Sequence, residues 1–291
     1  MQNRRDFIKQ ASMLLAGGVV MPQLLSSYRE ADPAKNIGLQ LYSLREMVKD
    51  SGIRAVLETV ARMGYRNLET ASSDNSRIYG LAPSEFRKIV TDLGMKCTSA
   101  HLNQSYTKET KAAVMSWWDK AIETYNEAGV KYIVQPSIDV NRDTTTDDLK
   151  EYCDYFNSVG YKTAAASIAF GYHNHAFEFR KIGDQLIYDI LLDNVSANHV
   201  FFQLDVYWCI EGGGDPVAYL KNRPRQFKTI HIKDEKEIGA SGQIDFKPIF
   251  DQMTANRVKD WYVEVEEYTD DDPVASVQQS FDFLNRAEYV K

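Results

Sequence analysis

The stretch IGLQLYSLREMVKDSGIRAVLETVARM, residues 37–63, contains the pattern that decides the fold. Its first seven residues, 37–43, are mostly apolar and typical of a strand. Residues 46–63 place apolar side chains at helical spacing. A strand followed at once by an amphipathic helix is one unit of an α/β protein with a parallel sheet.

The same strand–helix pair recurs along the chain. The further strands predicted are YRNLET (65–70), MKCTSAH (95–101), VKYIVQPS (130–137), TAAASIAFGYHNH (163–175), HVFFQLD (199–205), FKTIHIK (227–233) and DWYVEVEEY (260–268). Helical segments between them include DDLKEYCDYFNSVG (147–160) and DQLIYDILLD (184–193). Several strands are nearly continuous apolar runs, as in a sheet buried on both faces. Eight units in about 250 residues predict the α/β class and a single closed (β/α)8 TIM barrel, over residues 34–291.

The first 33 residues differ from this pattern. Arg4 and Arg5 precede a short apolar run, ASMLLAGGVVMPQLL. The arginines and the run together resemble a twin-arginine export signal. This segment predicts a periplasmic protein; an ordinary first helix in a cytoplasmic protein is the alternative. The rest of the chain has no run of the roughly 18 apolar residues that a membrane span requires.

Composition excludes some classes of function. The formal net charge of −7 disfavours a nucleic acid as partner, because binding phosphates requires a concentrated basic surface. No GxGxxG motif follows the first strand, so nothing indicates a dinucleotide site. Three well-separated cysteines form neither a disulfide framework nor a CxxC metal site.

Polar residues gather where the predicted strands end. Four of the five histidines lie there, and only His199 is at the start of a strand. The residues at these ends are Gln40, Tyr42, Glu69, His101, Gln135, His173, His175, Asp205, His231, Lys233, Glu264 and Glu266. In a (β/α)8 barrel these ends converge on the active site. Carboxylates and imidazoles facing one another without compensation are costly. We therefore expect one divalent metal ion, for which oxygen and imidazole ligands suit Mn, Zn or Co.

Five segments resemble the sugar phosphate isomerase/epimerase superfamily, the xylose-isomerase-like barrels. They are GLQLYSLRE, YHNHAFEF, LDVYW, HIKD and YVEVEEY, and the likeness spans residues 36–290. Members hold one metal ion with a Glu, an Asp, a His and a second Glu, so the resemblance implies Asp205, His231 and Glu264 as ligands. At the position of the first Glu this chain has His173. Either His173 or Glu178 would therefore be the fourth ligand.

The resemblance implies an isomerase or epimerase that acts on a keto sugar or related polyol. A proton next to a carbonyl leaves, and the metal stabilises the resulting enediolate. The candidate catalytic residues are Glu178, His175 and Glu264. His101, Gln135, Lys233, Glu69, Gln40 and Glu266 are candidates to hold substrate hydroxyls or the oxyanion, with Tyr42, Tyr207 and Trp208 as apolar walls for the sugar.

Other functions are compatible with the same residues. A lyase or hydratase that performs β-elimination on a 3-keto-glycoside shares the first step. A non-catalytic sugar-binding barrel and an endonuclease for abasic DNA are less favoured, because the ligand set is retained and the chain is acidic. Export and the lack of an Arg/Lys cluster after the seventh and eighth strands favour an unphosphorylated carbohydrate as the partner. The sequence leaves open whether the chain forms a homo-oligomer.

Overall fold

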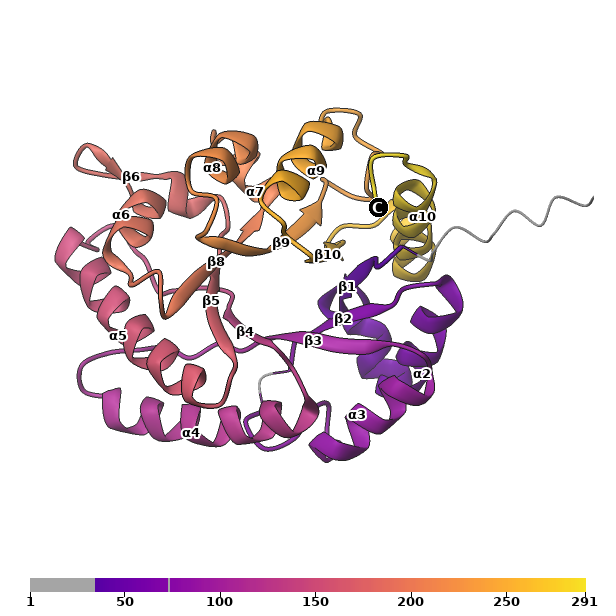
Figure 1. Cartoon of the computed structure of the whole chain (residues 1–291), viewed down its shortest axis with the longest axis horizontal. Coiled ribbons are helices and arrows are strands. Elements are labelled where there is room, and N and C mark those ends of the chain that lie inside the picture. Colours follow the sequence, from indigo (N-terminus) through magenta and orange to yellow (C-terminus); the bar gives the residue numbers. More distant parts are fainter. Residues whose placement is uncertain (1–34, 73) are drawn as a thin grey trace, which may run out of the picture. The chain divides into compact units, whose positions relative to one another are not determined.

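The structure, a computed structural model, describes residues 35–72 and 74–291. Eight parallel strands close into a barrel, drawn end-on in Figure 1. The barrel strands are β1 (Gly38–Gln40), β2 (Asn67–Thr70), β3 (Lys96–His101), β4 (Tyr132–Gln135), β5 (Ala169–His173), β8 (Val200–Asp205), β9 (Phe227–Lys233) and β10 (Asp260–Glu264). The barrel closes where β1 pairs with β10, through Gly38 opposite Tyr262 and Leu39 opposite Val263. The predicted single (β/α)8 barrel is therefore confirmed.

Helices surround the barrel (Figure 1). They are α2 (Arg45–Met63), α3 (Pro83–Asp92), α4 (Lys111–Ala128), α5 (Thr146–Ala165), α6 (Ile187–Asn194), α7 (Val206–Glu211), α8 (Pro216–Asn222), α9 (Phe246–Ala255) and α10 (Pro273–Arg286). Three short 3-10 helices, η1 (Leu41–Leu44), η2 (Phe177–Phe179) and η3 (Thr269–Asp271), and a two-stranded hairpin of β6 (Lys181–Ile182) and β7 (Gln185–Leu186) complete the described elements. Residue Gly52 interrupts α2 with φ of 78°, a conformation that glycine adopts readily.

Alternation along each strand separates an apolar layer from a polar interior. In β9, Ile230 and Ile232 are fully buried, and they share the face opposite to His231 and Lys233. In β8, Phe202 and Leu204 alternate in the same way with Gln203 and Asp205. The apolar set packs against the helices. The other set points into the barrel, where it forms the site described below.

Four local predictions were inaccurate. The first strand is only Gly38–Gln40, because residues 41–44 turn into η1. Residues 163–165, expected in the fifth strand, continue α5. The helix expected from residue 184 begins at Ile187, since residues 181–186 form the β6–β7 hairpin. Helix α7 was not predicted at all, because its six residues are too short for a periodic pattern.

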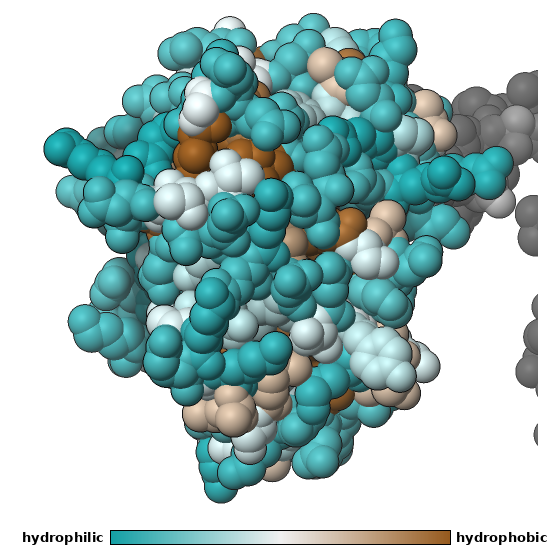
Figure 2. Space-filling view, turned by 90° about the vertical axis from the view of Figure 1, so that its left-hand side faces the viewer, coloured by the Kyte–Doolittle hydropathy of each residue, from teal (hydrophilic) through white to brown (hydrophobic). Residues whose placement is uncertain are grey.

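The outer face of the molecule is polar on the side that Figure 2 shows, with hydrophobic side chains in small patches only. Within the described residues, no helix is both long and apolar enough to cross a membrane. The predicted export segment, residues 1–33, lies outside the described residues and stays a prediction.

Candidate metal centre and substrate cavity

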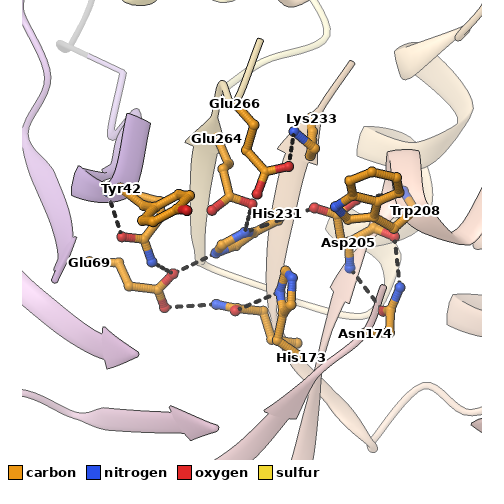
Figure 3. A network of polar contacts seen from close by, with 12 residues as sticks. Tyr42, Glu69, His173, Asn174, Asp205, Trp208, His231, Lys233, Glu264 and Glu266 are labelled. Carbon is orange, nitrogen blue, oxygen red and sulfur yellow. Dashed lines mark hydrogen bonds and ion pairs between the residues drawn. The ribbon is translucent and has the colours of Figure 1, made fainter. Parts of the chain in front are cut away.

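Four side chains from neighbouring strands meet at the carboxyl end of the barrel. They are His173 of β5, Asp205 of β8, His231 of β9 and Glu264 of β10, and Figure 3 shows them facing one another. Each has a ligand atom within 4.8 Å of those of the other three. All four side chains are at most 4% exposed. Parallel pairing explains the meeting, because Asp205 lies directly opposite His231 in the register of β8 and β9.

Asp205 has one oxygen that the protein does not use. Its Oδ1 accepts a hydrogen bond from the backbone N–H of Trp208 at 2.8 Å, which caps α7. Its Oδ2 is buried and has no hydrogen-bond partner. Burial raises the pKa of Asp205 to about 7. An unpartnered carboxylate oxygen aimed at two imidazoles and a second carboxylate is the arrangement that a cation would satisfy.

His231 lies between two carboxylates. Its Nε2 is 2.5 Å from Glu69 Oε2, and its Nδ1 is 3.2 Å from Glu264 Oε2. Burial alone would lower the pKa of His231, but Glu69 and Glu264 outweigh it and raise this pKa to about 10. Burial likewise opposes the charge of Glu264, yet His231 lowers the pKa of Glu264 to about 2. These three groups therefore form a buried ion-paired row.

The segment after β5 turns its polar groups in two directions. His173 Nδ1 is 3.2 Å from Gln203 Oε1, and burial lowers the pKa of His173 well below its usual value. Glu178 instead accepts a hydrogen bond from the Tyr172 hydroxyl at 2.5 Å and one from the His175 backbone at 2.8 Å. Its side chain is fully buried, and burial raises its pKa to about 8. Glu178 belongs neither to the group of four nor to the cavity lining, so the geometry favours His173 as the fourth ligand.

A cavity of about 360 Å³ opens above this group. Its lining residues are Tyr42, Ala71, Ser72, His101, Asn103, Pro136, Ser137, His173, His175, Glu264 and Glu266. His175 is half-buried there, its Nδ1 has no partner, and burial lowers its pKa to about 4. At neutral pH this imidazole is therefore uncharged. Tyr42, with 43% of its surface exposed, lies at the mouth.

Lys233 is at the rim of the same end of the barrel. Its Nζ is 3.0 Å from Glu266 and lies 5.5 Å from the ring centres of both Tyr207 and Trp208. Only 1% of Lys233 is exposed. The ion pair and the two aromatic rings hold the ammonium group in place. Tyr207 and Trp208 contact this lysine and do not line the cavity.

Three further residues predicted to contact substrate are buried in the protein and do not line the cavity. Gln40 and Glu69 are fully buried beneath the group of four, where the Gln40 amide donates to Glu69 at 2.8 Å. Gln135 is also fully buried and accepts a hydrogen bond from Tyr155 of α5 at 2.9 Å. Because Gln135 follows Val134 on β4, it points to the helices and not to the barrel interior. These side chains support the site from within the protein.

Sequence reasoning missed several residues. Gln203, two positions before Asp205, lies in the polar interior and contacts both His101 and His173. Asn174 holds Asp205 by accepting from its backbone N–H at 3.0 Å. The spacing of Gln203 to Asp205 was the available signal for the first, because residues i and i+2 share a face of a strand. Asn174 has the opposite parity to the two histidines beside it, and nothing in the sequence indicated its role.

Comparison with known proteins identifies the family. Residues 57–287 match the model of the xylose isomerase-like TIM barrel, so the chain belongs to that family. A sugar phosphate isomerase/epimerase from Parabacteroides distasonis is 35% identical, with a TM-score of 0.83, and the match covers 88% of this chain and all of that one. The superfamily resemblance seen in the sequence is confirmed.

Two more distant proteins are also similar to the chain. An L-ribulose 3-epimerase, 15% identical, has the same fold with a TM-score of 0.70 over 87% of this chain and 93% of its own. An inosose dehydratase from Clostridium tetani is 23% identical over 147 residues, which is 42% of this chain. This match spans about half the length of the dehydratase. Sugar epimerases and dehydratases therefore both occur among the proteins that the chain resembles.

Proposed function

We propose that the protein is a divalent-metal-dependent isomerase or epimerase of a keto sugar or related polyol. The observation that carries this proposal is the buried, unpartnered Oδ2 of Asp205, placed among His173, His231 and Glu264 directly below an open cavity. Two carboxylates and two imidazoles suit Mn, Zn or Co. A divalent ion held there would supply Lewis acidity toward a carbonyl oxygen and so acidify the neighbouring C–H bond.

The cavity residues can perform the proton transfers. Glu264 and His175 both line the cavity, and each has an atom able to accept a proton: a carboxylate oxygen of Glu264 and the unpartnered Nδ1 of His175. One of them removes the proton from the carbon next to the carbonyl, and the electron pair moves into an enediolate. If the proton returns to the former carbonyl carbon, the product is an isomer. If it returns to the original carbon from the opposite face, the product is an epimer.

An uncharged carbohydrate suits this cavity better than a phosphorylated one. No Arg or Lys is among the cavity lining in the described part of the chain, whereas Glu264 and Glu266 are. The nearest buried cation, Lys233, is already paired with Glu266 at 3.0 Å. Phosphate binding in this fold commonly uses the loops after the seventh and eighth strands. A periplasmic location, which the first 33 residues predict, would be consistent with a free sugar or glycoside.

Elimination is a second candidate, favoured by one feature of the site. His173 stands where related epimerases have a glutamate, so β5 contributes an imidazole and not a carboxylate to the cavity that Glu264 lines. With a leaving group beta to the carbanion, the C–O bond breaks, a double bond forms and the departing oxygen takes a proton. The partial similarity to an inosose dehydratase supports this reaction class.

The test combines metal analysis with hydrogen exchange. Purified protein, stripped with a chelator and reloaded with Mn²⁺, Zn²⁺ or Co²⁺, is incubated in D₂O with free keto sugars and with 3-keto-glycosides. We expect metal-dependent deuterium incorporation at the carbon next to the carbonyl. An epimer or isomer as product supports the first reaction, and an enone supports elimination. Binding of sugars without exchange under every metal would contradict both and indicate a sugar-binding barrel.

A further inference from the structure

A second polar layer lies directly beneath the group of four ligands. It consists of Glu69 of β2 and Gln203 of β8, both fully buried, together with Gln40 and Ser99. These two side chains contact three of the site's imidazoles, those of His101, His173 and His231. Figure 3 shows Glu69 and His231 pointing toward one another, joined by a dashed line. The reaction described above makes no use of this layer.

The Glu69 carboxylate fixes a proton on His231. An ionised carboxylate can only accept hydrogen bonds. Glu69 already accepts hydrogen bonds on both oxygens, from the Ser99 hydroxyl and the Gln203 amide on Oε1 and from the Gln40 amide on Oε2, so it acts here as an acceptor. His231 Nε2 is 2.5 Å from Glu69 Oε2, so this nitrogen carries a hydrogen. The lone pair of a neutral His231 must then be on Nδ1, the atom that faces Glu264 at 3.2 Å and Asp205 at 4.0 Å.

Gln203 fixes which ring nitrogen of His173 carries a hydrogen. The Gln203 amide nitrogen donates to Glu69 Oε1 at 2.8 Å, because the carboxylate cannot donate in return. Its oxygen Oε1 therefore points the other way, at 2.6 Å from His101 Nε2 and 3.2 Å from His173 Nδ1. An amide oxygen is also only an acceptor, so both of these nitrogens carry hydrogens. A neutral His173 is left with its lone pair on Nε2.

We propose that Glu69 and Gln203 are positioning residues that set the tautomers of His231 and His173. They place hydrogens on the inner nitrogens and leave Nδ1 of His231 and Nε2 of His173 to bind the cation. This inference rests on the proposed metal centre. A carboxylate or amide behind a metal-binding imidazole raises ligand basicity and fixes ring orientation. The layer also decides between two groups of possible ligands.

The alternative group contains His101, His173 and His231, whose ligand atoms also lie within 4.8 Å of one another. His101 has its Nε2 held by Gln203 at 2.6 Å and by Glu69 at 3.1 Å, so that atom is not free to bind a metal. In the group that contains His101, the polar layer thus already supplies the hydrogen bonds. The group of four instead contains the unpartnered Asp205 Oδ2, which a cation would satisfy.

The first test measures the affinity for Zn²⁺ alone, by competition with a chromophoric chelator. Glu69→Gln places an amide N–H against one of the groups that now donate to Glu69, from Gln40, Ser99, Gln203 or His231. Gln203→Leu removes the oxygen that faces His173 Nδ1. We expect each to weaken Zn²⁺ binding about 10–100-fold. Thr229→Val is the matched control: Thr229 is fully buried two residues before His231, and its hydroxyl has no partner. This variant should bind Zn²⁺ as the parent does.

The second test identifies the bound nitrogens. In ¹⁵N-histidine-labelled, Zn²⁺-loaded parent protein, nitrogen shifts should show zinc on Nδ1 of His231 and on Nε2 of His173, with a hydrogen on the other nitrogen of each ring. Zinc on the opposite nitrogens would overturn the inference even if a variant fails to fold. So would unchanged affinity in both folded variants. Failure of the parent itself to bind a divalent ion would instead overturn the metal centre and the proposed function with it.

Discussion

At the lower end of the barrel, where the strands begin, Asp260 accepts hydrogen bonds from Asn67 at 3.2 Å and Tyr132 at 3.1 Å. At the upper end, Asp205 has one oxygen with no partner. Both carboxylates are buried and both lie on inward-facing positions of strands. Asp260 at the lower end is also near the ammonium groups of Lys96 and Lys131, whereas the upper cluster, the group of four, is left with an unpaired oxygen. Because leaving buried polar atoms unpaired is costly, the contrast distinguishes a structural cluster from a binding site.

The largest effect that separates the two ends should come from Glu264→Gln. The substitution keeps the shape of the side chain but removes the carboxylate that lines the cavity and pairs with His231. We expect turnover, or deuterium exchange into the substrate, to fall about 10²–10⁴-fold, as for a lost acid–base group. Bound metal is quantified in the same sample. Full turnover in this variant would remove Glu264 from the chemistry.

A change at the lower end should affect stability and leave the metal untouched. Asn67→Leu deprives Asp260 of a donor and Thr98 of the oxygen to which its hydroxyl donates at 2.7 Å. Unpaired buried polar groups of this kind cost about 1–3 kcal/mol each. Urea denaturation should show a lower free energy of unfolding, with the affinity for Zn²⁺ unchanged. If metal affinity falls instead, the two ends of the barrel are coupled and the contrast between them fails.

A smaller, pH-dependent effect should appear at Glu178, at the upper end. Burial raises the pKa of Glu178 to about 8 in the folded protein, from an ordinary value of 4.5. Between these pH values the folded state holds the proton more tightly than the unfolded chain, so stability contributed by this group falls as pH rises. Glu178→Gln removes this dependence. The stability of the variant relative to the parent should therefore increase from pH 5 to pH 8.5.

Thermal unfolding of both proteins across this pH range makes the measurement. A difference that stays constant with pH would mean that Glu178 is already ionised when folded. The same substitution should leave the bound metal in place, since the side chain is turned toward Tyr172 at 2.5 Å.

Sequence alone was sufficient for the barrel and for three members of the upper cluster, and it left the fourth open between His173 and Glu178. Period and alternation locate strands, and the closed sheet brings their ends together, so Asp205, His231 and Glu264 could be expected to meet, with His173 or Glu178 beside them. What a side chain contacts depends on more than its place near a strand end. Gln135 was misplaced because the parity of β4 directs it toward α5, as its bond with Tyr155 shows.

The sequence also could not predict how deep along the barrel axis each side chain lies. Glu69 ends its strand in the sequence as Glu264 does, yet it is covered by Gln40, Ser99, Gln203 and His231. The stagger of the strands, including a register shift between Leu68 and Glu69, sets which layer each residue joins. No local sequence pattern predicts that stagger. The supporting carboxylate of Glu69 and the cavity-lining carboxylate of Glu264 therefore cannot be distinguished from the sequence.

The central claim is that the upper cluster is incomplete without a cation, and titration with a divalent ion tests it most directly. Metal-free protein is titrated with Mn²⁺ or Zn²⁺ by calorimetry, in parallel with Asp205→Asn, which replaces the unpartnered oxygen or its neighbour by an amide nitrogen. The account predicts one ion per chain in the parent and binding that is strongly weakened in the variant. No saturable binding by the parent, or equal affinity in Asp205→Asn, would contradict it.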